Sequence, residues 1–470
     1  MKHYKLYELF ETLGNGELRR LRRFLQSPYY TTRPDVLAAF DYLAARRGAG
    51  RPMPERELLF QHTFPGEAYD DQKIRATMSG LAELIEQFWL AEARNEDSYG
   101  SQTALAQIYR RRGLERQFRW TMKKAARHLE HSTLRDPDYY EKRLAYQAEW
   151  LEYQSASKRT TELHLQEITD TLDISYLLAK LRYACTQLTH TAVYQRAYRF
   201  GILPLALEEA KRLGYLDIPA VAIYYYCYSF LKEGYNLPHF QRFRSLLLEH
   251  GPVFSSKEKK GLYLLAINFC IRQMNSGSME FAREGWAMYQ QGLEQEVLLE
   301  DGWLSRFTFY NIAATGIRLG EFEAVERFIR EYEGRLKEEY RVASVQFIQA
   351  RLAFARGELS QAAAILQSVD FKDMVNNLIA KNLLIKAYYG LQEYDLLEAQ
   401  LESLRTFILR KDFSDYHRSN YLNIIRFVQR LISLAPYDAE GRQKLEADIQ
   451  KAEVLTERKW LLEQVRGGGA

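Results

Sequence analysis

The stretch CYSFLKEG, residues 227–234, recurs with the same spacing as CIRQMNSG (270–277), AATGIRLG (313–320) and ARLAFARG (350–357). Each copy places a small residue seven positions before a glycine, and the glycines are 43, 43 and 37 residues apart. Intervals of this size are typical of stacked two-helix units, because one helix hairpin cannot bury its apolar face alone and packs on its neighbours. The pattern predicts an all-α fold in which helix pairs build an α-α superhelix.

Length and composition agree with this interpretation. A chain of 470 residues is too long for one ordinary core, so it forms either several domains or a solenoid that grows by adding units. Hydrophobic residues make up 47% and charged residues 27%, which is typical of a folded chain. No proline lies between Pro252 and Pro436, which favours long uninterrupted helices.

The sequence indicates neither export nor membrane insertion. Lys5 and Glu8 interrupt the apolar run that a secretory signal requires. The longest weakly polar run, residues 218–231, is shorter than the roughly 20 residues needed to span a bilayer. We expect a soluble cytoplasmic protein with no membrane partner.

Three parts are predicted along the chain. They are an N-terminal helical module (1–96), a helical-repeat solenoid (101–436) and a C-terminal capping helix with a frayed tail (437–470). The acidic segment 95–100 marks the first boundary. Two helices are expected within residues 160–198, and the C-terminal helices are expected over about 414–434 and about 440–464.

A second spacing strengthens the repeat. A glycine, an apolar residue two positions later and an alanine five positions later occur together in three places, beginning at Gly201, Gly277 and Gly357. Combined with the small residue ahead of the glycine, this pattern resembles the tetratricopeptide-repeat family over roughly residues 180–410. The two intervals of 43 residues are well beyond the usual length of about 34, Val325 stands where alanine is expected, and Gln392 replaces the last glycine. The resemblance implies a tetratricopeptide-like solenoid with lengthened helices.

The resemblance also implies a concave groove lined by the first helix of each pair. Carried over to this chain, the groove candidates are Tyr224, Tyr228, Asn268, Ile271, Tyr310, Asn311, Arg318, Phe347 and Arg351. An asparagine amide offers both a donor and an acceptor to an extended peptide. Arg318 and Arg351 can meet a carboxylate. The aromatic candidates are also typical of packing between helices, and that alternative stays open.

Sequence motifs give catalysis no support. The chain lacks the GxxxxGK, GxSxG and HExxH patterns, and His128 and His131 have no third ligand at a suitable spacing. The string from Ser256 to Lys259 matches the SxxK of some acyl-transfer enzymes. The same segment predicts a capping box, with Ser255 and Glu258 at the start of a helix. We therefore expect no enzyme, and no catalytic, cofactor or metal site.

The three cysteines are interpreted through the repeat. Cys185, Cys227 and Cys270 are 42 and 43 residues apart, a spacing that would also suit ligands or redox partners brought together by folding. However, Cys227 and Cys270 occupy the small position seven before the glycine, where later copies have alanine. We interpret them as packing residues.

Positive charge gathers near the N-terminal end, although the formal net charge is only +4. Residues 101–130 carry eight basic and two acidic side chains. The basic candidates are Arg110, Arg111, Arg112, Arg116, Arg119, Lys123, Lys124 and Arg127, joined by Arg19, Arg20, Arg22 and Arg23. A solvated surface, a nucleic-acid contact and an acidic protein partner all fit this pattern.

Taken together, these features predict a non-enzymatic adaptor that binds a peptide or protein segment in the concave face of a helical-repeat superhelix. The alternative is a transcriptional or other nucleic-acid-associated regulator that uses its basic N-terminal end.

Overall fold

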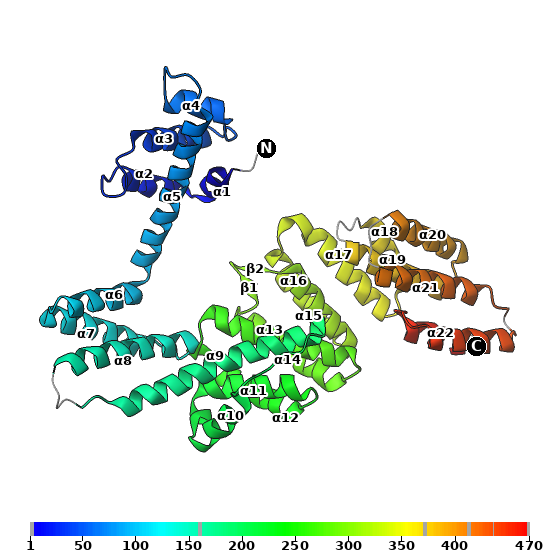
Figure 1. Cartoon of the computed structure of the whole chain (residues 1–470). Helices are drawn as coiled ribbons and strands as arrows, with labels where there is room; N and C mark the ends of the chain where they lie inside the picture. The colour runs from blue at the N-terminus through cyan, green and yellow to red at the C-terminus, as the bar shows by residue number, and fades with distance from the viewer. Residues whose placement is uncertain (1–3, 158–161, 370–373, 411–414, 436, 468–470) are drawn as a thin grey trace. The chain divides into compact units, whose positions relative to one another are not determined.

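The computed structural model describes residues 4–157, 162–369, 374–410, 415–435 and 437–467. Within these ranges the chain is all-α, with 23 α-helices, three 3-10 turns and one hairpin of two-residue strands (Figure 1). The chain divides into two compact units, Met1–Ser175 and Tyr176–Ala470. The division falls inside helix α9 (Leu165–Tyr194).

The first unit contains two clusters of helices. Helices α1 to α4 pack around the long helix α5, and α6 and α7 form a hairpin that packs on α8. The bounds are α1 (Lys5–Thr12), α2 (Asn15–Leu25), α3 (Pro34–Gly48), α4 (Arg56–Thr63), α5 (Asp71–Glu96), α6 (Ser98–Arg111), α7 (Glu115–His131) and α8 (Pro137–Ser157). The core of the α1–α5 cluster is drawn from residues between Leu6 and Phe88.

Local signals explain where these helices begin. Pro34 lies in the first turn of α3, where its missing N–H is not needed. The Asp70 carboxylate accepts hydrogen bonds from the backbone N–H groups of Gln72 and Lys73 and so caps α5. Asp97 caps α6 only one residue after α5 ends. The domain boundary predicted near residue 96 therefore coincides with a helix break, and the three-part division stays a prediction.

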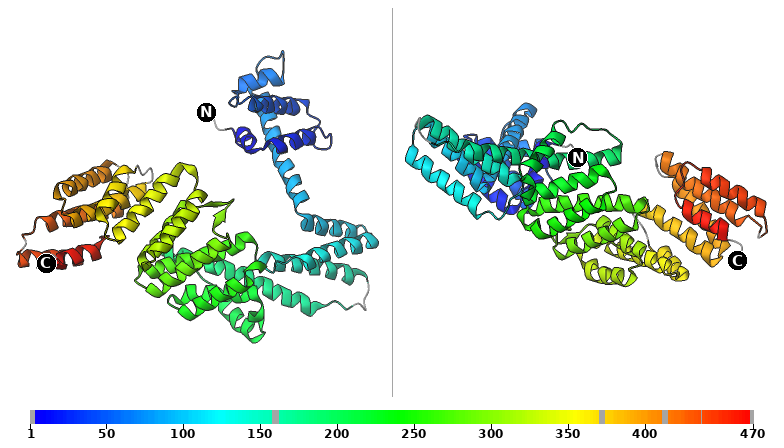
Figure 2. Two further views of the ribbon diagram at one scale, coloured as in Figure 1. Left: turned by 180° about the vertical axis from the view of Figure 1, so that it is seen from behind. Right: turned by 90° about the horizontal axis from the view of Figure 1, so that it is seen from below.

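The second unit is a succession of paired helices, in which each helix packs most extensively on its neighbour in the chain (Figure 2). Its α-helices after α9 are α10 (Leu203–Arg212), α11 (Pro219–Glu233), α12 (Leu237–His250), α13 (Ser256–Asn275), α14 (Met279–Glu294), α15 (Arg306–Leu319), α16 (Phe322–Tyr332), α17 (Glu338–Ala355), α18 (Leu359–Ser368), α19 (Met374–Leu391), α20 (Tyr394–Arg410), α21 (Asp415–Ile432), α22 (Ala439–Lys451) and α23 (Arg458–Gly467). The 3-10 turns are η1 (Tyr215–Asp217), η2 (Gly251–Val253) and η3 (Glu333–Arg335).

Four turns between paired helices close in the same way. The residue after the turn position donates its backbone N–H to the carbonyl five residues back, at 2.9–3.0 Å, in the pairs Ser278 to Gln273, Glu321 to Gly316, Glu358 to Ala353 and Glu393 to Tyr388. This closure satisfies a carbonyl at the helix end and requires a left-handed residue at the turn. Gly277, Gly320 and Gly357 have φ of 104°, 78° and 83° there, and Gln392 has φ of 59°. Gln392 therefore occupies the expected glycine position.

The small residues seven positions before Gly234, Gly277, Gly320 and Gly357 are packing residues, as predicted. Cys227, Cys270, Ala313 and Ala350 are all buried. A methyl group added to Gly285 of α14 would lie only 3.0 Å from the Cys270 Cβ. The two helices approach closely at this point, so a larger side chain at position 270 would push them apart.

Several local predictions were wrong. Residues 165–194 form one helix instead of two, and the helix expected over 440–464 breaks at residues 452–457. In the described structure the predicted capping box is absent, since the Ser255 side chain does not cap α13 and the Glu258 carboxylate accepts a hydrogen bond from the Tyr224 hydroxyl. The tail predicted to fray includes residues 468–470, which lie outside the described residues.

A short hairpin was not foreseen. Strands β1 (Leu299–Glu300) and β2 (Trp303–Leu304) pair antiparallel, with Leu299 opposite Leu304. The two turn residues, Asp301 and Gly302, have φ of 50° and 81°. Two left-handed residues match the right-handed twist of such a hairpin.

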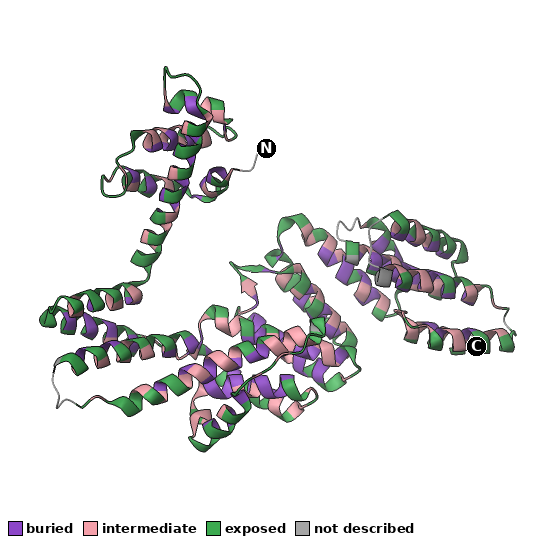
Figure 3. Cartoon of the chain, in the orientation of Figure 1, coloured by how far each residue is buried: buried purple, intermediate pink, exposed green. Residues whose placement is uncertain are grey.

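Buried residues lie on the faces that paired helices turn toward one another, and exposed residues lie on the opposite faces (Figure 3). No helix in the described ranges combines the length and the apolar character needed to cross a membrane.

Two substitutions at equivalent turns test whether a left-handed residue is required there. Gly357→Gln should lower the free energy of unfolding of the second unit by about 1 kcal/mol, because an ordinary residue is strained in the left-handed region. An added side chain would meet nothing within 4 Å, so the cost is conformational. Gln392→Gly, at the equivalent turn, should cause no comparable loss. Urea unfolding followed by circular dichroism compares the two, and equal destabilisation would contradict the shared closure.

Candidate functional site

Three of the groove candidates are buried. Tyr224, Tyr228 and Phe347 expose only 2%, 3% and 1% of their surface. The Tyr224 hydroxyl donates a hydrogen bond to the Glu258 carboxylate, which also lies 3.6 Å from Arg182. Burial, reinforced by this carboxylate, raises the pKa of Tyr224. In the described structure these aromatic side chains fill space between helices, as the packing alternative has it.

The other candidates reach solvent. Asn268, Asn311 and Arg318 are exposed, whereas Ile271, Tyr310 and Arg351 are partly buried. Tyr310 and Ser344 share a hydrogen bond of 2.9 Å between their hydroxyl groups. Burial lowers the pKa of the Arg351 guanidinium, and the carboxylate of Glu457 opposes that shift. The exposed candidates Asn268, Asn311 and Arg318 thus lie on α13 and α15. Arg351 on α17 instead interacts electrostatically with the carboxylate of Glu457 in the C-terminal region.

That carboxylate belongs to a non-helical connector between α22 and α23, which we call connector 452–457. The Asn423 side-chain amide donates to the Val454 carbonyl at 2.9 Å, and the Thr456 N–H donates to Asn420 Oδ1 at 2.5 Å. Both bonds reach main-chain atoms of the connector. Two asparagines one helical turn apart on α21 therefore hold a segment that has no helical bonds of its own.

The side chain of Glu457 is held by helix α19. Asn382 donates its amide to Glu457 Oε1 at 3.0 Å, and Lys386 Nζ lies 2.9 Å from Glu457 Oε2. The Lys386 ammonium also lies 5.2 Å from the centre of the Phe354 ring and 5.8 Å from that of Trp460. Burial raises the pKa of nearby Tyr421, and the Glu457 carboxylate adds to that shift. Helix α19 therefore forms a site for a carboxylate, in which the Lys386 ammonium lies near the rings of Phe354 and Trp460.

Sequence reasoning missed this site. Asn382 and Lys386 are four residues apart, and Asn420 and Asn423 are three apart, so each pair shares a helix face. That periodicity was available in the sequence. The break at residues 452–457 was not, since no glycine or proline marks it.

The basic cluster of the first unit is only partly free. Arg110 forms a bidentate pair with the buried Glu149, with its Nε 2.6 Å from Glu149 Oε1, and lies 3.8 Å from Glu152. The Arg119 Nε donates to the Tyr153 hydroxyl at 3.1 Å. These two arginines therefore serve the contacts of α6 and α7 with α8.

The remaining basic side chains form an uncompensated face, which we call the α7 basic face. It comprises Arg111, Arg112, Arg116, Lys123, Lys124 and Arg127, all of them exposed. Within the described parts of the chain, no acidic side chain forms an ion pair with any of them. Trp120 lies among them with 59% of its surface exposed, and Lys124 Nζ lies 3.4 Å from the centre of its ring. Cations beside an exposed indole suit phosphates and bases.

The N-terminal arginines are less available. Arg20 lies 2.5 Å from Glu92, and Arg22 forms a bidentate pair with Asp41 at 2.7 and 3.0 Å. Two of the four positive charges on α2 are therefore compensated within the α1–α5 cluster.

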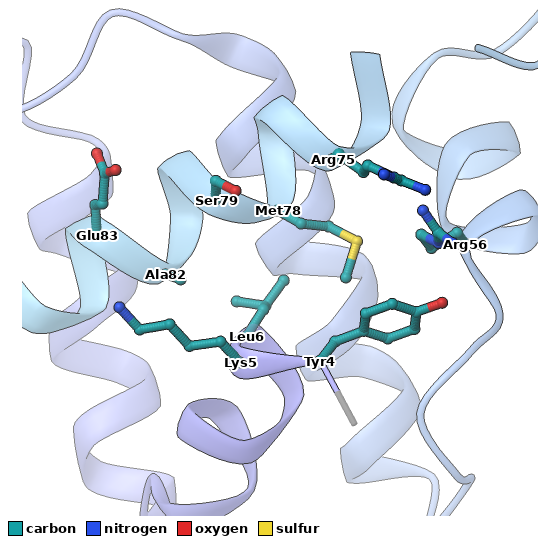
Figure 4. Close-up of a pocket in the computed structure, with 9 residues that line it drawn as sticks. All are labelled: Tyr4, Lys5, Leu6, Arg56, Arg75, Met78, Ser79, Ala82 and Glu83. Carbon is teal, nitrogen blue, oxygen red and sulfur yellow. The ribbon is translucent and has the colours of Figure 1, made fainter. Parts of the chain in front are cut away.

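A cavity of about 530 Å³ opens between α1 and α5 in the first unit (Figure 4). Its cations are already paired, because Arg56 and Arg75 lie 2.5 and 2.7 Å from Asp71, and Lys5 lies 2.7 Å from Glu86. A hydrogen bond from Tyr69, together with these arginines, lowers the pKa of Asp71. The cavity therefore presents little uncompensated charge to an anion.

Of the residues considered above for metal or redox chemistry, the fold brings two together, since the Cys185 and Cys227 side chains lie within hydrogen-bonding reach of each other. His128 and His131 are exposed on α7, and all three cysteines are buried with free thiols. No group of three or more His, Cys, Asp and Glu side chains in the described ranges is arranged to hold a metal ion.

No protein-family model, curated protein or solved structure matches this chain. Its function is therefore inferred from its own geometry.

The cysteines allow a direct check of their packing role. Burial raises the pKa of the Cys227 and Cys270 thiols, so little reactive thiolate forms at moderately alkaline pH. Iodoacetamide should leave all three cysteines unmodified in the folded protein and alkylate all three in guanidinium chloride. Intact mass spectrometry reads the outcome, and rapid labelling of the folded chain would show that a thiol is accessible.

Proposed function

We propose that this chain is a non-enzymatic scaffold whose second unit is a tetratricopeptide-like solenoid that binds a peptide or protein segment. The recurring left-handed turns and the buried small residues support the solenoid, because a left-handed residue lies at the turn of five successive helix pairs from α11 to α20 and a buried cysteine or alanine precedes it in the first four. Such stacks create extended surfaces on which side chains of successive helices align.

The observation that carries the binding role is the pair Asn268 and Asn311. They occupy the same place in α13 and α15, nine residues before a turn glycine, and both are exposed. Their neighbours Phe269 and Ile312 are buried. Successive exposed amides on firmly packed helices suit an extended chain, which needs donors and acceptors in pairs. Arg318, exposed on α15, adds a positive charge for an acidic group on the partner.

Replacing both amides tests this surface. Asn268→Ala combined with Asn311→Ala should preserve the thermal midpoint and weaken capture of partners from the native host by the tagged full-length chain, read by quantitative mass spectrometry. The matched control is Asn275→Ala with Gln349→Ala, which removes two exposed amides from α13 and α17. Equal capture by both double variants would refute the proposed surface.

A nucleic-acid-associated function is the second candidate, and the α7 basic face favours it. Six exposed cations without ion-pair partners in the described ranges lie on α7 and at the end of α6, and one of them, Lys124, lies over the ring of the exposed Trp120. Cations supply the electrostatic part of nucleic-acid binding, and the indole supplies a stacking surface.

Charge removal separates this candidate from a merely solvated surface. The triple variant Arg116→Gln, Lys123→Gln and Arg127→Gln should weaken binding of labelled single-stranded RNA or duplex DNA. It should also reduce the slope of log affinity against log salt, by about 2 for single-stranded RNA and by about 3 for duplex DNA. Fluorescence anisotropy across a salt series measures both effects.

The control removes the same charge from elsewhere in the first unit, through Arg19→Gln, Arg23→Gln and Arg51→Gln, all exposed positions. If both triple variants weaken binding equally, nucleic acid is attracted by the overall charge of the first unit and not by the α7 basic face. If the wild-type chain does not bind nucleic acid at low salt, the nucleic-acid-associated function is refuted.

A further inference from the structure

Connector 452–457 is held in the way that a bound peptide is held. Asn423 and Asn420 contact its carbonyl at Val454 and its N–H at Thr456, two residues apart. Contacts to the main chain do not depend on the side chains of the segment. The same two amides would therefore accept an extended chain of different sequence.

One side chain of the connector is recognised specifically. The two oxygens of Glu457 meet different groups on α19, the Asn382 amide and the Lys386 ammonium. Lys386 is mostly buried, with 15% of its side chain exposed, and Arg351 on α17 adds a longer-range attraction. A carboxylate is the group that satisfies an amide donor and a buried cation together.

The connector is nevertheless an incomplete ligand for this face. Glu457 has φ of 56°, in the left-handed region that non-glycine residues seldom adopt. The other atom of the Asn382 amide, Oδ1, is buried and has no hydrogen-bond partner among the described residues. An unmet acceptor in a residue that is 7% exposed marks a place where a donor is missing. A segment that supplied an N–H there, without the strained residue, would fit better.

The connector is packed together with the helices on either side of it. Helices α22 and α23 contact each other more extensively than either contacts α21. Arg458 donates to the carbonyls of Gln450 and Ala452 and so ties the end of α22 to the start of α23. The two helices and the connector therefore form one packed piece, which is also joined to α21 by the 2.7 Å ion pair between Arg430 and Asp448 and to α19 by the ring contact between Tyr389 and Trp460.

We propose that the face formed by Asn382, Lys386, Asn420 and Asn423 is a binding site for an extended peptide bearing a carboxylate side chain, and that connector 452–457 occupies it in cis until such a peptide displaces it. This inference rests on the proposed function, a scaffold that binds protein segments. It names the site, the recognised group and the internal competitor.

The experiment supplies the connector in trans. A fluorescent peptide with the sequence AEVLTERKW, residues 452–460, is titrated into the full-length chain. It should bind the wild type weakly, because the internal copy competes. It should bind a Glu457→Ala chain at least about tenfold more tightly, because freeing a site that is occupied nine-tenths of the time raises its apparent affinity about tenfold.

Matched controls locate the binding. Glu453→Ala in the chain should behave as wild type, because Glu453 lies in the same connector but is exposed. A peptide with glutamine in place of Glu457 should lose most of its affinity, and one with glutamine in place of Glu453 should not. Adding Asn420→Ala and Asn423→Ala to the Glu457→Ala chain should abolish binding. Equal affinity for wild-type and Glu457→Ala chains, or binding that survives loss of both asparagines, would overturn the proposal.

Hydrogen exchange on the wild-type chain decides the matter if Glu457→Ala impairs folding. Excess AEVLTERKW peptide should remove the protection of the Thr456 amide, whereas the peptide lacking the Glu457 carboxylate should leave it protected. Unchanged protection with both peptides would sink the proposal. Partner capture through Asn268 and Asn311 depends on α13 and α15, so failure here with capture intact refutes this site and leaves the scaffold function standing.

Discussion

The second unit depends on how a helix ends before its partner begins. At four turns the first N–H of the new helix region returns to a carbonyl five residues back, which is feasible only when the turn residue has positive φ. This closure fixes the phase of both helices relative to the turn. The residue seven positions earlier is buried at all four turns, and it is small at three of them (Cys270, Ala313 and Ala350) and Ile385 at the fourth.

Because this constraint is local, the sequence predicts it well. Glycine is the residue that tolerates positive φ most readily, so its spacing predicted the turns, and the pattern also placed Gln392 at the last of them. Tyr224 and Phe347 were harder to predict. In a helix buried on most sides, periodicity does not distinguish a residue that faces the groove from one that faces the next helix pair. Long-range contacts decide this, such as the bond from Tyr224 to Glu258.

The availability of the basic side chains likewise depends on both local sequence and distant contacts. A run of arginines is visible in the sequence, but its availability depends on acids that are far along the chain. Glu149 neutralises Arg110 from 39 residues away, and Glu92 reaches Arg20 across 72 residues. After these pairs form, the uncompensated cations among the described residues of the two clusters are those of the α7 basic face together with Arg19 and Arg23 on α2. Net charge alone would not reveal that surface, because pairing leaves the total unchanged.

The site that binds the Glu457 carboxylate is more stable when a carboxylate occupies it than when it is empty. Lys386 lies between two aromatic rings with little access to water, so removing Glu457 would leave a buried cation without its counter-ion. The amides of Asn382 and Asn420 are also mostly buried and would lose their partners. Emptying the face is therefore costly, whereas exchanging one carboxylate-bearing segment for another preserves every pairing. This asymmetry favours direct replacement of the connector by a competing segment over an open intermediate.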